Sequence, residues 1–268
     1  MDKLEKLKEL VIEKNIQLHA SEAPIYEIIH PELFNWYHTK KCWEDIHYIF
    51  QELGSKSEIN VLDLGCGTGF LSLKVLEKPN ANITGVDLSH EMLNELEKKI
   101  NPDKRGKIRL IHQEGETFLQ SNEMKFDLIM TSALLHHLVD FRKLIDLAIG
   151  HLTPNGILYI AYEPLKQPID NGLKFIFHRL VRKIDITLLH ISVKMKGITI
   201  EEDQESRLAD YQTTLGGIDP DHVIGCLKDL GEILKYDKFA ARAFGIFAYI
   251  SDKWIKSQNT FSLIFRKS

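Results

Sequence analysis

Residues 61–70, with the sequence VLDLGCGTGF, constrain the fold more than any other part of the 268-residue chain. They form a short apolar run that holds one acid, Asp63, followed by glycines at Gly65, Gly67 and Gly69. Because glycine has no Cβ, such a turn lets a ligand contact the backbone, and the helix that follows offers unpaired N–H groups and partial positive charge. The segment predicts a buried strand that ends at a ligand-binding loop, since ligands of open α/β sheets bind beyond the carboxyl ends of the strands.

From residue 59 onward the chain alternates between strand-like and helix-like segments. We expect strands at INVLDL, NITGVDL, KIRLIH, FDLIMTS and GILYIAYE, and two further strands at EILKYDKFA and NTFSLIFRKS. Between them we expect helices at TGFLSLKVLEK, at HEMLNELEKKI with Ser89 as its N-cap, at FRKLIDLAIGHL with Asp140 as its N-cap, and at DPDHVIGCLKDLG. Helices of this length between strands imply right-handed crossovers and a mostly parallel sheet covered on both faces.

This pattern predicts a single α/β domain with four parts. Residues 1–57 form a helical N-terminal cap, 58–164 the ligand-binding core, and 219–268 the last strands of the core sheet. Residues 165–218 interrupt the strand–helix rhythm, and we expect them to form an inserted lid, because long connections inside compact domains are usually functional.

Composition narrows the class of protein. A formal net charge of −4 gives no general attraction to nucleic acid, and no nucleic-acid partner is expected. Three widely spaced cysteines form no disulfide framework, the charged N-terminus lacks the apolar core of a signal peptide, and no apolar run is long enough to span a bilayer. We therefore expect a soluble cytoplasmic protein.

The residues around the glycine loop indicate which ligand it binds. The nicotinamide pattern GxGxxG fails because Phe70 occupies the third glycine position, and no GK[ST] of a P-loop follows. Asp63 would repel a pyrophosphate but could hold an ammonium group. Asp87, at the end of the second strand, could accept hydrogen bonds from both ribose hydroxyls, and Glu114 could accept one from an adenine amino group. Together these three acids describe S-adenosylmethionine.

On the segments VLDLGCGTG, ITGVDLS, HQEGETF, FDLIMTSALLHHL and LTPNGILYIAYEP, the chain resembles the class I S-adenosylmethionine-dependent methyltransferases over residues 58–164. The resemblance implies a Rossmann-like seven-stranded sheet of order 3-2-1-4-5-7-6 with strand 7 antiparallel. It also implies that the cofactor lies against Asp63, Gly65, Cys66, Gly67, Gly69, Asp87, Leu88, Glu114, Gly115, Ser132 and Ala133. Most family members carry Asp where this chain has Glu114.

The resemblance further implies methyl transfer from S-adenosylmethionine, with S-adenosylhomocysteine as the product. A protein base is needed only for an acceptor that enters protonated, and the candidates are His136, His137 and Glu163, which otherwise pack, cap a helix or bind substrate. The sequence TSAL after the fourth strand differs from the [DN]PP[YW] motif of enzymes that methylate base amino groups, which favours a small-molecule acceptor. Two alternatives remain: a methyltransferase that acts on protein or RNA, and a non-catalytic cofactor-binding partner protein. No metal site is expected, because the twelve histidines do not cluster with acids at ligand spacing.

Two further regions carry hypotheses. The aromatic residues of 22–50 and 239–254 either roof a pocket for an apolar or aromatic acceptor or form core contacts, and Tyr26 and Tyr37 are candidates to close over the cofactor. Apolar residues of 173–195 fall on one face of a predicted helix that also carries Lys174, Arg182 and Lys183. This helix is a substrate-covering lid, a dimer contact or a membrane-surface helix, and the protein is a monomer or a homodimer.

Overall fold

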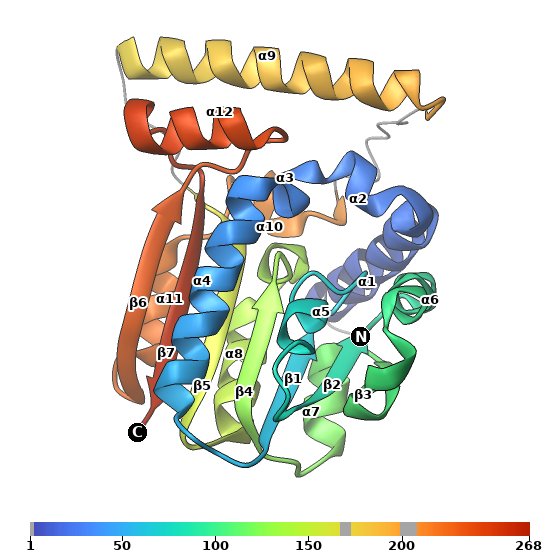
Figure 1. The fold of residues 1–268 in the computed structure, drawn as a ribbon, viewed down its shortest axis with the longest axis vertical. Helices are drawn as coiled ribbons and strands as arrows, with labels where there is room; N and C mark the ends of the chain where they lie inside the picture. Colours follow the sequence, from blue (N-terminus) through green and yellow to red (C-terminus); the bar gives the residue numbers. More distant parts are fainter. Residues whose placement is uncertain (1–2, 167–172, 199–207) are drawn as a thin grey trace.

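In a computed structural model, which describes residues 3–166, 173–198 and 208–268, the chain forms one seven-stranded sheet (Figure 1). The strand order is β3-β2-β1-β4-β5-β7-β6; β7 runs antiparallel to both of its neighbours, whereas the other paired strands are parallel. The predicted fold class is thereby confirmed, and all seven expected strands are present. Their bounds are β1 (Ile59–Leu64), β2 (Ala81–Asp87), β3 (Ile108–His112), β4 (Phe126–Ser132), β5 (Leu152–Pro164), β6 (Gly231–Phe239) and β7 (Thr260–Lys267).

Helices cover both faces of the sheet because successive residues of each strand point to opposite sides. In β1, Val61 joins the core beneath one group of helices, while its neighbour Leu62 joins the core on the opposite face. The first group consists of α4 (Trp36–Leu53), α5 (Ser72–Val75) and α6 (His90–Lys99), and the second of α7 (Gly115–Ser121), α8 (Phe141–His151) and α11 (Pro220–Leu227).

Most of the remaining helices lie near the carboxyl ends of the parallel strands, in the upper half of Figure 1. The N-terminal ones are α1 (Lys3–Glu22), the 3₁₀ turn η1 (Ala23–Ile25), α2 (Tyr26–Ile29) and α3 (Pro31–Phe34). The later ones are the turn η3 (Leu135–His137), α9 (Leu173–Met195), α10 (Tyr211–Thr214), α12 (Gly245–Ile250) and the π-helical turn η5 (Ser251–Ile255); the 3₁₀ turn η2 (Pro102–Lys107) precedes β3. Within the described ranges, no helix is both long and apolar enough to cross a membrane.

Of the expected helices, α6 begins as predicted, and two others differ in detail from the prediction. Ser89 caps α6 as expected, since its Oγ accepts a hydrogen bond from the backbone N–H of Met92. Asp140 occupies the N-cap position of α8, but its side chain makes no capping hydrogen bond. The helix expected over residues 68–78 is regular only at Ser72–Val75, because bonds to the third preceding carbonyl, such as Lys74 to Leu71, alternate with helical ones around it.

Candidate functional site

A cavity opens at the carboxyl edge of β1, β2, β3 and β4, where the glycine loop ends. Its wall combines the loops after these four strands with one side of α1 and with the segment 137–140 that leads into α8. Ten residues singled out from the sequence lie on this wall: Tyr26, Gly65, Gly67, Asp87, Leu88, Glu114, Gly115, Ser132, Ala133 and His137. The fold thus brings together side chains and backbone that are spread over more than a hundred residues of chain.

The glycine loop takes a backbone shape that favours glycine at each of its three positions. Gly65, Gly67 and Gly69 have φ values of 66°, 49° and 96°, which L-residues with a Cβ rarely adopt. A Cβ on Gly69 would lie 2.4 Å from Leu96, so this glycine allows α6 to pack against the loop. A Cβ on Gly67 would meet no atom within 4 Å, so this backbone is open to a ligand in the cavity.

Asp87 binds the glycine loop and also faces the cavity. One carboxylate oxygen accepts from the backbone N–H of Gly67 at 2.7 Å, and the other accepts from that of Ser89 at 2.8 Å. Burial raises the pKa of the carboxyl, although these two bonds oppose the shift. A carboxylate offers about four acceptor positions. Asp87 can therefore hold the loop and still accept hydrogen bonds from a pair of ribose hydroxyls.

Four residues assigned to the cofactor from the sequence are not among the described residues that line the cavity: Asp63, Cys66, Gly69 and Tyr37. Asp63 is buried beneath the loop, where it accepts a hydrogen bond from the Ser72 hydroxyl at 2.6 Å, and burial raises its pKa to about 7. Its carboxylate supports the loop instead of facing a ligand. The Tyr37 hydroxyl donates to Asp252 at 2.5 Å, so this side chain joins α4 to η5.

The far wall of the cavity offers groups suited to the rest of an adenosyl ligand. Glu114 precedes α7 and accepts from the Thr117 hydroxyl at 2.5 Å, which leaves acceptor positions on its carboxylate. The buried Ser132 Oγ has no hydrogen-bond partner among the described residues, an arrangement that is costly unless a ligand or water completes it. Ala133 has a φ of 51°, and such strained residues cluster at functional sites. These features fit S-adenosylmethionine.

His137 projects into the cavity from η3, and the hydrogen bonds of its Nδ1 fix its tautomer. This nitrogen lies 2.8 Å from the carbonyl oxygen of Ala209 and 3.2 Å from Oδ1 of Asp210. Because a carbonyl can only accept, Nδ1 carries the hydrogen, and Nε2 of the neutral ring is free to accept a proton. Burial disfavours the charged ring, but the bond to Asp210 outweighs it, so the pKa of His137 is raised and that of Asp210 is lowered.

His136 and Glu163 form a second pair beside the first. Glu163 is fully buried and accepts from the backbone N–H groups of Leu134, Leu135 and His136 as well as lying 3.0 Å from His136 Nδ1. Its carboxylate therefore fixes the turn η3 that presents His137. The structure places Glu163 as an anchor of this turn, and it does not line the cavity.

Several site residues were not identified from the sequence. One side of α1 lines the cavity, including Asn15 and His19, and burial followed by the nearby His137 lowers the pKa of His19 to about 3. Asp210 was also missed, and with it the grouping of His136, His137 and Asp210, whose ligand atoms lie within 4.8 Å of one another. This grouping is not visible in the spacing of histidines and acids along the sequence. These residues carry no local motif and meet only through the fold.

The aromatic roof and the lid contribute less to this cavity than the sequence suggested. Of the aromatic residues in 22–50 and 239–254, only Tyr26 lines the cavity within the described part of the chain. Phe239 instead packs in the core against His38 and Tyr162. No described residue of α9 reaches the cavity wall, and α9 packs against η5 and α2.

Comparison with known proteins supports the fold and the domain. Residues 61–156 match a family model described as a methyltransferase domain. The chain is 32% identical over 108 residues to malonyl-[acyl-carrier protein] O-methyltransferase 2 of Ilyobacter polytropus, covering 40% of each protein. It is 34% identical over 117 residues to a ubiquinone biosynthesis O-methyltransferase of Coxiella burnetii, covering 43% of this chain and 48% of that one. The chain thus matches less than half the length of these curated relatives.

The solved structure of the plantazolicin methyltransferase BpumL in complex with S-adenosylhomocysteine superposes with a TM-score of 0.57. The match covers 98% of both chains at 16% identity, a level at which the likeness concerns the fold. The matched residues 61–156 include the glycine loop and the strands β2, β3 and β4, whose ends surround the cavity. The order of the strands in the sheet agrees with this match.

Proposed function

For this chain, which belongs to the class I S-adenosylmethionine-dependent methyltransferases, we propose transfer of the cofactor's methyl group to a small-molecule acceptor, with release of S-adenosylhomocysteine. The observation that carries the proposal is the cavity itself, in which the open backbone at Gly67, the Asp87 carboxylate and the unpartnered Ser132 hydroxyl meet at the ends of three strands. Methyl transfer from a sulfonium is an in-line displacement, so positioning of the two reactants supplies much of the acceleration.

The cavity has apolar as well as polar lining, which supports an acceptor with apolar character. The glycine loop and the acids line part of its wall, and α1, the segment after η3 and α8 contribute aliphatic side chains. These are Val11, Ile12, Ile16, Leu138, Val139 and, from α8, Leu144. Such side chains bind apolar groups and exclude water from the sulfonium. The two O-methyltransferase relatives support oxygen as the attacked atom.

We assign His137 as the base for an acceptor that enters as an alcohol or a phenol. Asp210 and Ala209 hold its Nδ1–H, and Nε2 is then the free acceptor, which is the arrangement in which a carboxylate orients a catalytic imidazole. Glu163 and His136 are positioning residues, because the Glu163 carboxylate is fully buried and its oxygens accept from η3.

Cofactor binding tests the first part of the proposal. Isothermal titration calorimetry of the folded protein should give a defined dissociation constant for S-adenosylmethionine and for S-adenosylhomocysteine. Asp87→Asn should raise both constants about tenfold or more, because hydrogen bonds to a charged group contribute about 1.5–3 kcal/mol. The matched control is Asp103→Asn, an exposed acid in η2, which should leave binding unchanged. Absence of heat for both compounds would end the proposal.

The pH dependence of turnover tests the base. A metabolite extract incubated with methyl-labelled cofactor identifies an acceptor, and kcat/KM is then measured against pH. Because the base must be unprotonated and the pKa of His137 is raised, activity should rise with pH through a value above 6.5. Asp210→Asn should move this rise in activity to lower pH. His137→Gln should abolish the rise, whereas His136→Gln should retain it. A profile that is unchanged in the His137 variant would contradict the assignment.

A further inference from the structure

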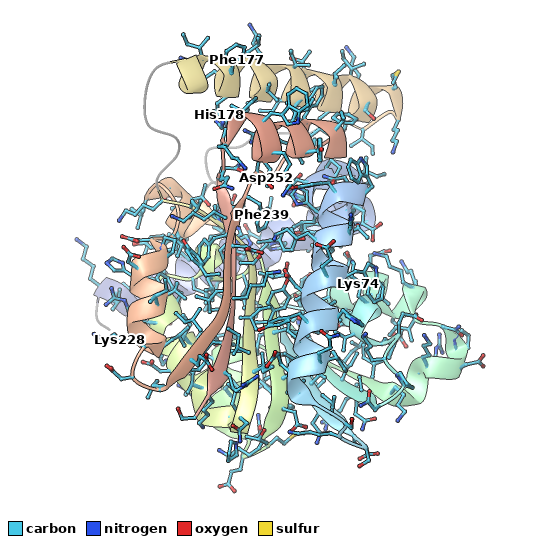
Figure 2. All side chains as sticks on the ribbon, turned by 60° about the vertical axis from the view of Figure 1, so that its left-hand side comes forward. Lys74, Phe177, His178, Lys228, Phe239 and Asp252 are labelled. Carbon is cyan, nitrogen blue, oxygen red and sulfur yellow. The ribbon has the colours of Figure 1, made fainter. Side chains whose placement is uncertain are left out.

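The helix α9 turns polar side chains toward the protein and apolar side chains outward, the reverse of an ordinary amphipathic helix. Its polar residues His178 and Asp185 are 7% and 3% exposed and face the body of the protein together with Val193. His178 Nδ1 accepts from Arg242 Nη2 at 2.9 Å, and Asp185 accepts from the backbone N–H groups of Ala243 and Phe244. Figure 2 shows His178 on the side of α9 toward α12 and Phe177 on the outer side. The helix is therefore attached through these polar contacts as well as through Val193.

Its apolar residues form a stripe that faces away from the protein. At helical spacing, Phe177, Leu180, Ile184, Leu188, Ile191 and Met195 are 53%, 53%, 41%, 41%, 49% and 78% exposed. Positions three and four apart fall on one side of a helix, so these six side chains are continuous along it. The neighbouring turn η5, which contacts α9, carries Trp254 at 78% exposure. We call the six residues of α9 the outer apolar stripe. Contiguous exposed apolar surface of this kind marks an interaction site.

A basic edge runs beside the outer apolar stripe. On a helical projection, Lys183 and Lys194 fall next to the stripe, on the side of the helix away from Asp185. Both lysines are exposed. Arg182 and Lys196 are exposed as well. Over residues 176–198 the chain has five Lys and Arg residues, and its single acid, Asp185, is buried and bonded to backbone N–H groups. The exposed side of α9 is therefore apolar and cationic.

We propose that the outer apolar stripe and its basic edge bind the surface of a membrane that contains anionic lipids, with α9 lying in the plane of the interface. A helix with one apolar face and Lys or Arg beside it binds in this way, because apolar burial and attraction to headgroups add together. Tryptophan is favoured at the same depth. A second copy of the chain fits less well, since a two-fold contact through this helix would place cationic edges together without an exposed acid on the described part of α9.

The position of α9 in the fold is consistent with this orientation. It lies across the end of the molecule toward which the parallel strands run, the end that also carries the cavity (Figure 1). At 23 residues and 1.5 Å per residue, the helix provides a contact line about 35 Å long. The protein would therefore lie on a bilayer with the carboxyl edge of its sheet directed toward the lipid.

Vesicle co-sedimentation of the full chain tests the proposal. Sucrose-loaded vesicles of phosphatidylcholine with about 30% phosphatidylglycerol should retain the protein at low salt, and pure phosphatidylcholine should retain much less. The combined emission of the three tryptophans should shift to shorter wavelength on binding, because Trp254 enters the interface. Leu188→Glu should lower the vesicle partition coefficient about tenfold or more, because it places a charge in the centre of the stripe. Met124→Glu, at an apolar residue of similar exposure (44%) between α7 and β4, should leave it unchanged.

Circular dichroism and cofactor calorimetry of both variants establish that they remain folded, independently of lipid. No co-sedimentation with the anionic vesicles at low salt would overturn the proposal, as would equal binding by wild type and Leu188→Glu. If sedimentation velocity shows a dimer that Leu188→Glu dissociates, while vesicles retain neither form, the stripe is an interface between two copies and the membrane proposal fails.

Discussion

Helices α4 and α9 are of similar length and both are amphipathic, yet they use opposite faces to contact the protein. The 18-residue α4 buries Cys42, Ile46, Ile49 and Leu53 in the core against the sheet. The 23-residue α9 buries His178, Asp185 and Val193 and leaves its apolar stripe exposed. Burial of apolar area holds α4 in place, whereas a small number of hydrogen bonds and the buried Val193 hold α9. We expect the two helices to respond differently to the same substitution.

The largest expected difference concerns truncation of one apolar side chain in each helix. Ile49 is fully buried in α4, so Ile49→Ala should lower the free energy of unfolding by about 2–5 kcal/mol through lost burial and a residual cavity. Ile184→Ala on α9 removes the same atoms from a side chain that is 41% exposed and should change stability by no more than about 0.5 kcal/mol. Urea denaturation followed by circular dichroism measures both.

The control for this pair is the cofactor, which should be absent from both titrations because binding to the native state adds stability. Equal losses in the two variants would mean that the apolar side of α9 is covered in solution. The two helices would then not differ in how they contact the protein, and the outer apolar stripe would not be available to bind a membrane.

How much the sequence predicts also differs between these two regions. Strands and helices of the core follow from local patterns, because the glycine loop, the Ser89 cap and the period of the apolar residues each depend on a few neighbouring residues. The helix over 173–195 was also predicted from its periodicity, but periodicity shows only that one face is apolar. It does not show whether that face meets the protein, and the bonds of Asp185 to Ala243 and Phe244 join residues about 58 positions apart.

The same reasoning applies to the candidate site. Asp87 and Glu114 follow strand ends, and strand ends of a parallel sheet meet at one edge, so their place on the cavity wall could be predicted. Asp63 looked equivalent, but it lies inside β1, level with Gly85 and not with Asp87, and its carboxylate is buried beneath the loop against Ser72. His19 and Asp210 reach His137 from α1 and from the segment before α10, and no local spacing relates them. Long-range packing decides such residues.

A smaller effect is expected from the polar contacts of α9. Asp185→Ala leaves the backbone N–H groups of Ala243 and Phe244 without their acceptor and should cost about 1–3 kcal/mol of local stability. Thr187→Ala, at an exposed position of the same helix, is the matched control. Hydrogen–deuterium exchange should show faster exchange in α9 and α12 for the Asp185 variant alone, with α4 unchanged. Equal protection of α9 in both variants would show that other contacts hold the helix.

The smallest expected effect is a pH dependence of α9 that depends on His178. Burial, followed by the charge of Arg242, lowers the pKa of His178 to about 4 from its ordinary 6.5. As the pH falls, His178 therefore takes up a proton in the detached helix before it does so in the folded protein. The stability that His178 contributes is complete above about pH 6.5 and is lost as the pH falls to about 4.

Hydrogen–deuterium exchange, corrected for intrinsic rates, measures this effect. The protection of α9 should fall more between pH 7 and pH 5 in the wild type than in His178→Gln, which keeps an acceptor for Arg242. Asp185, whose pKa burial raises, acts in the opposite direction in both proteins, so their difference reports the histidine alone. Identical pH dependence would mean that the imidazole is not part of the contact between α9 and the core.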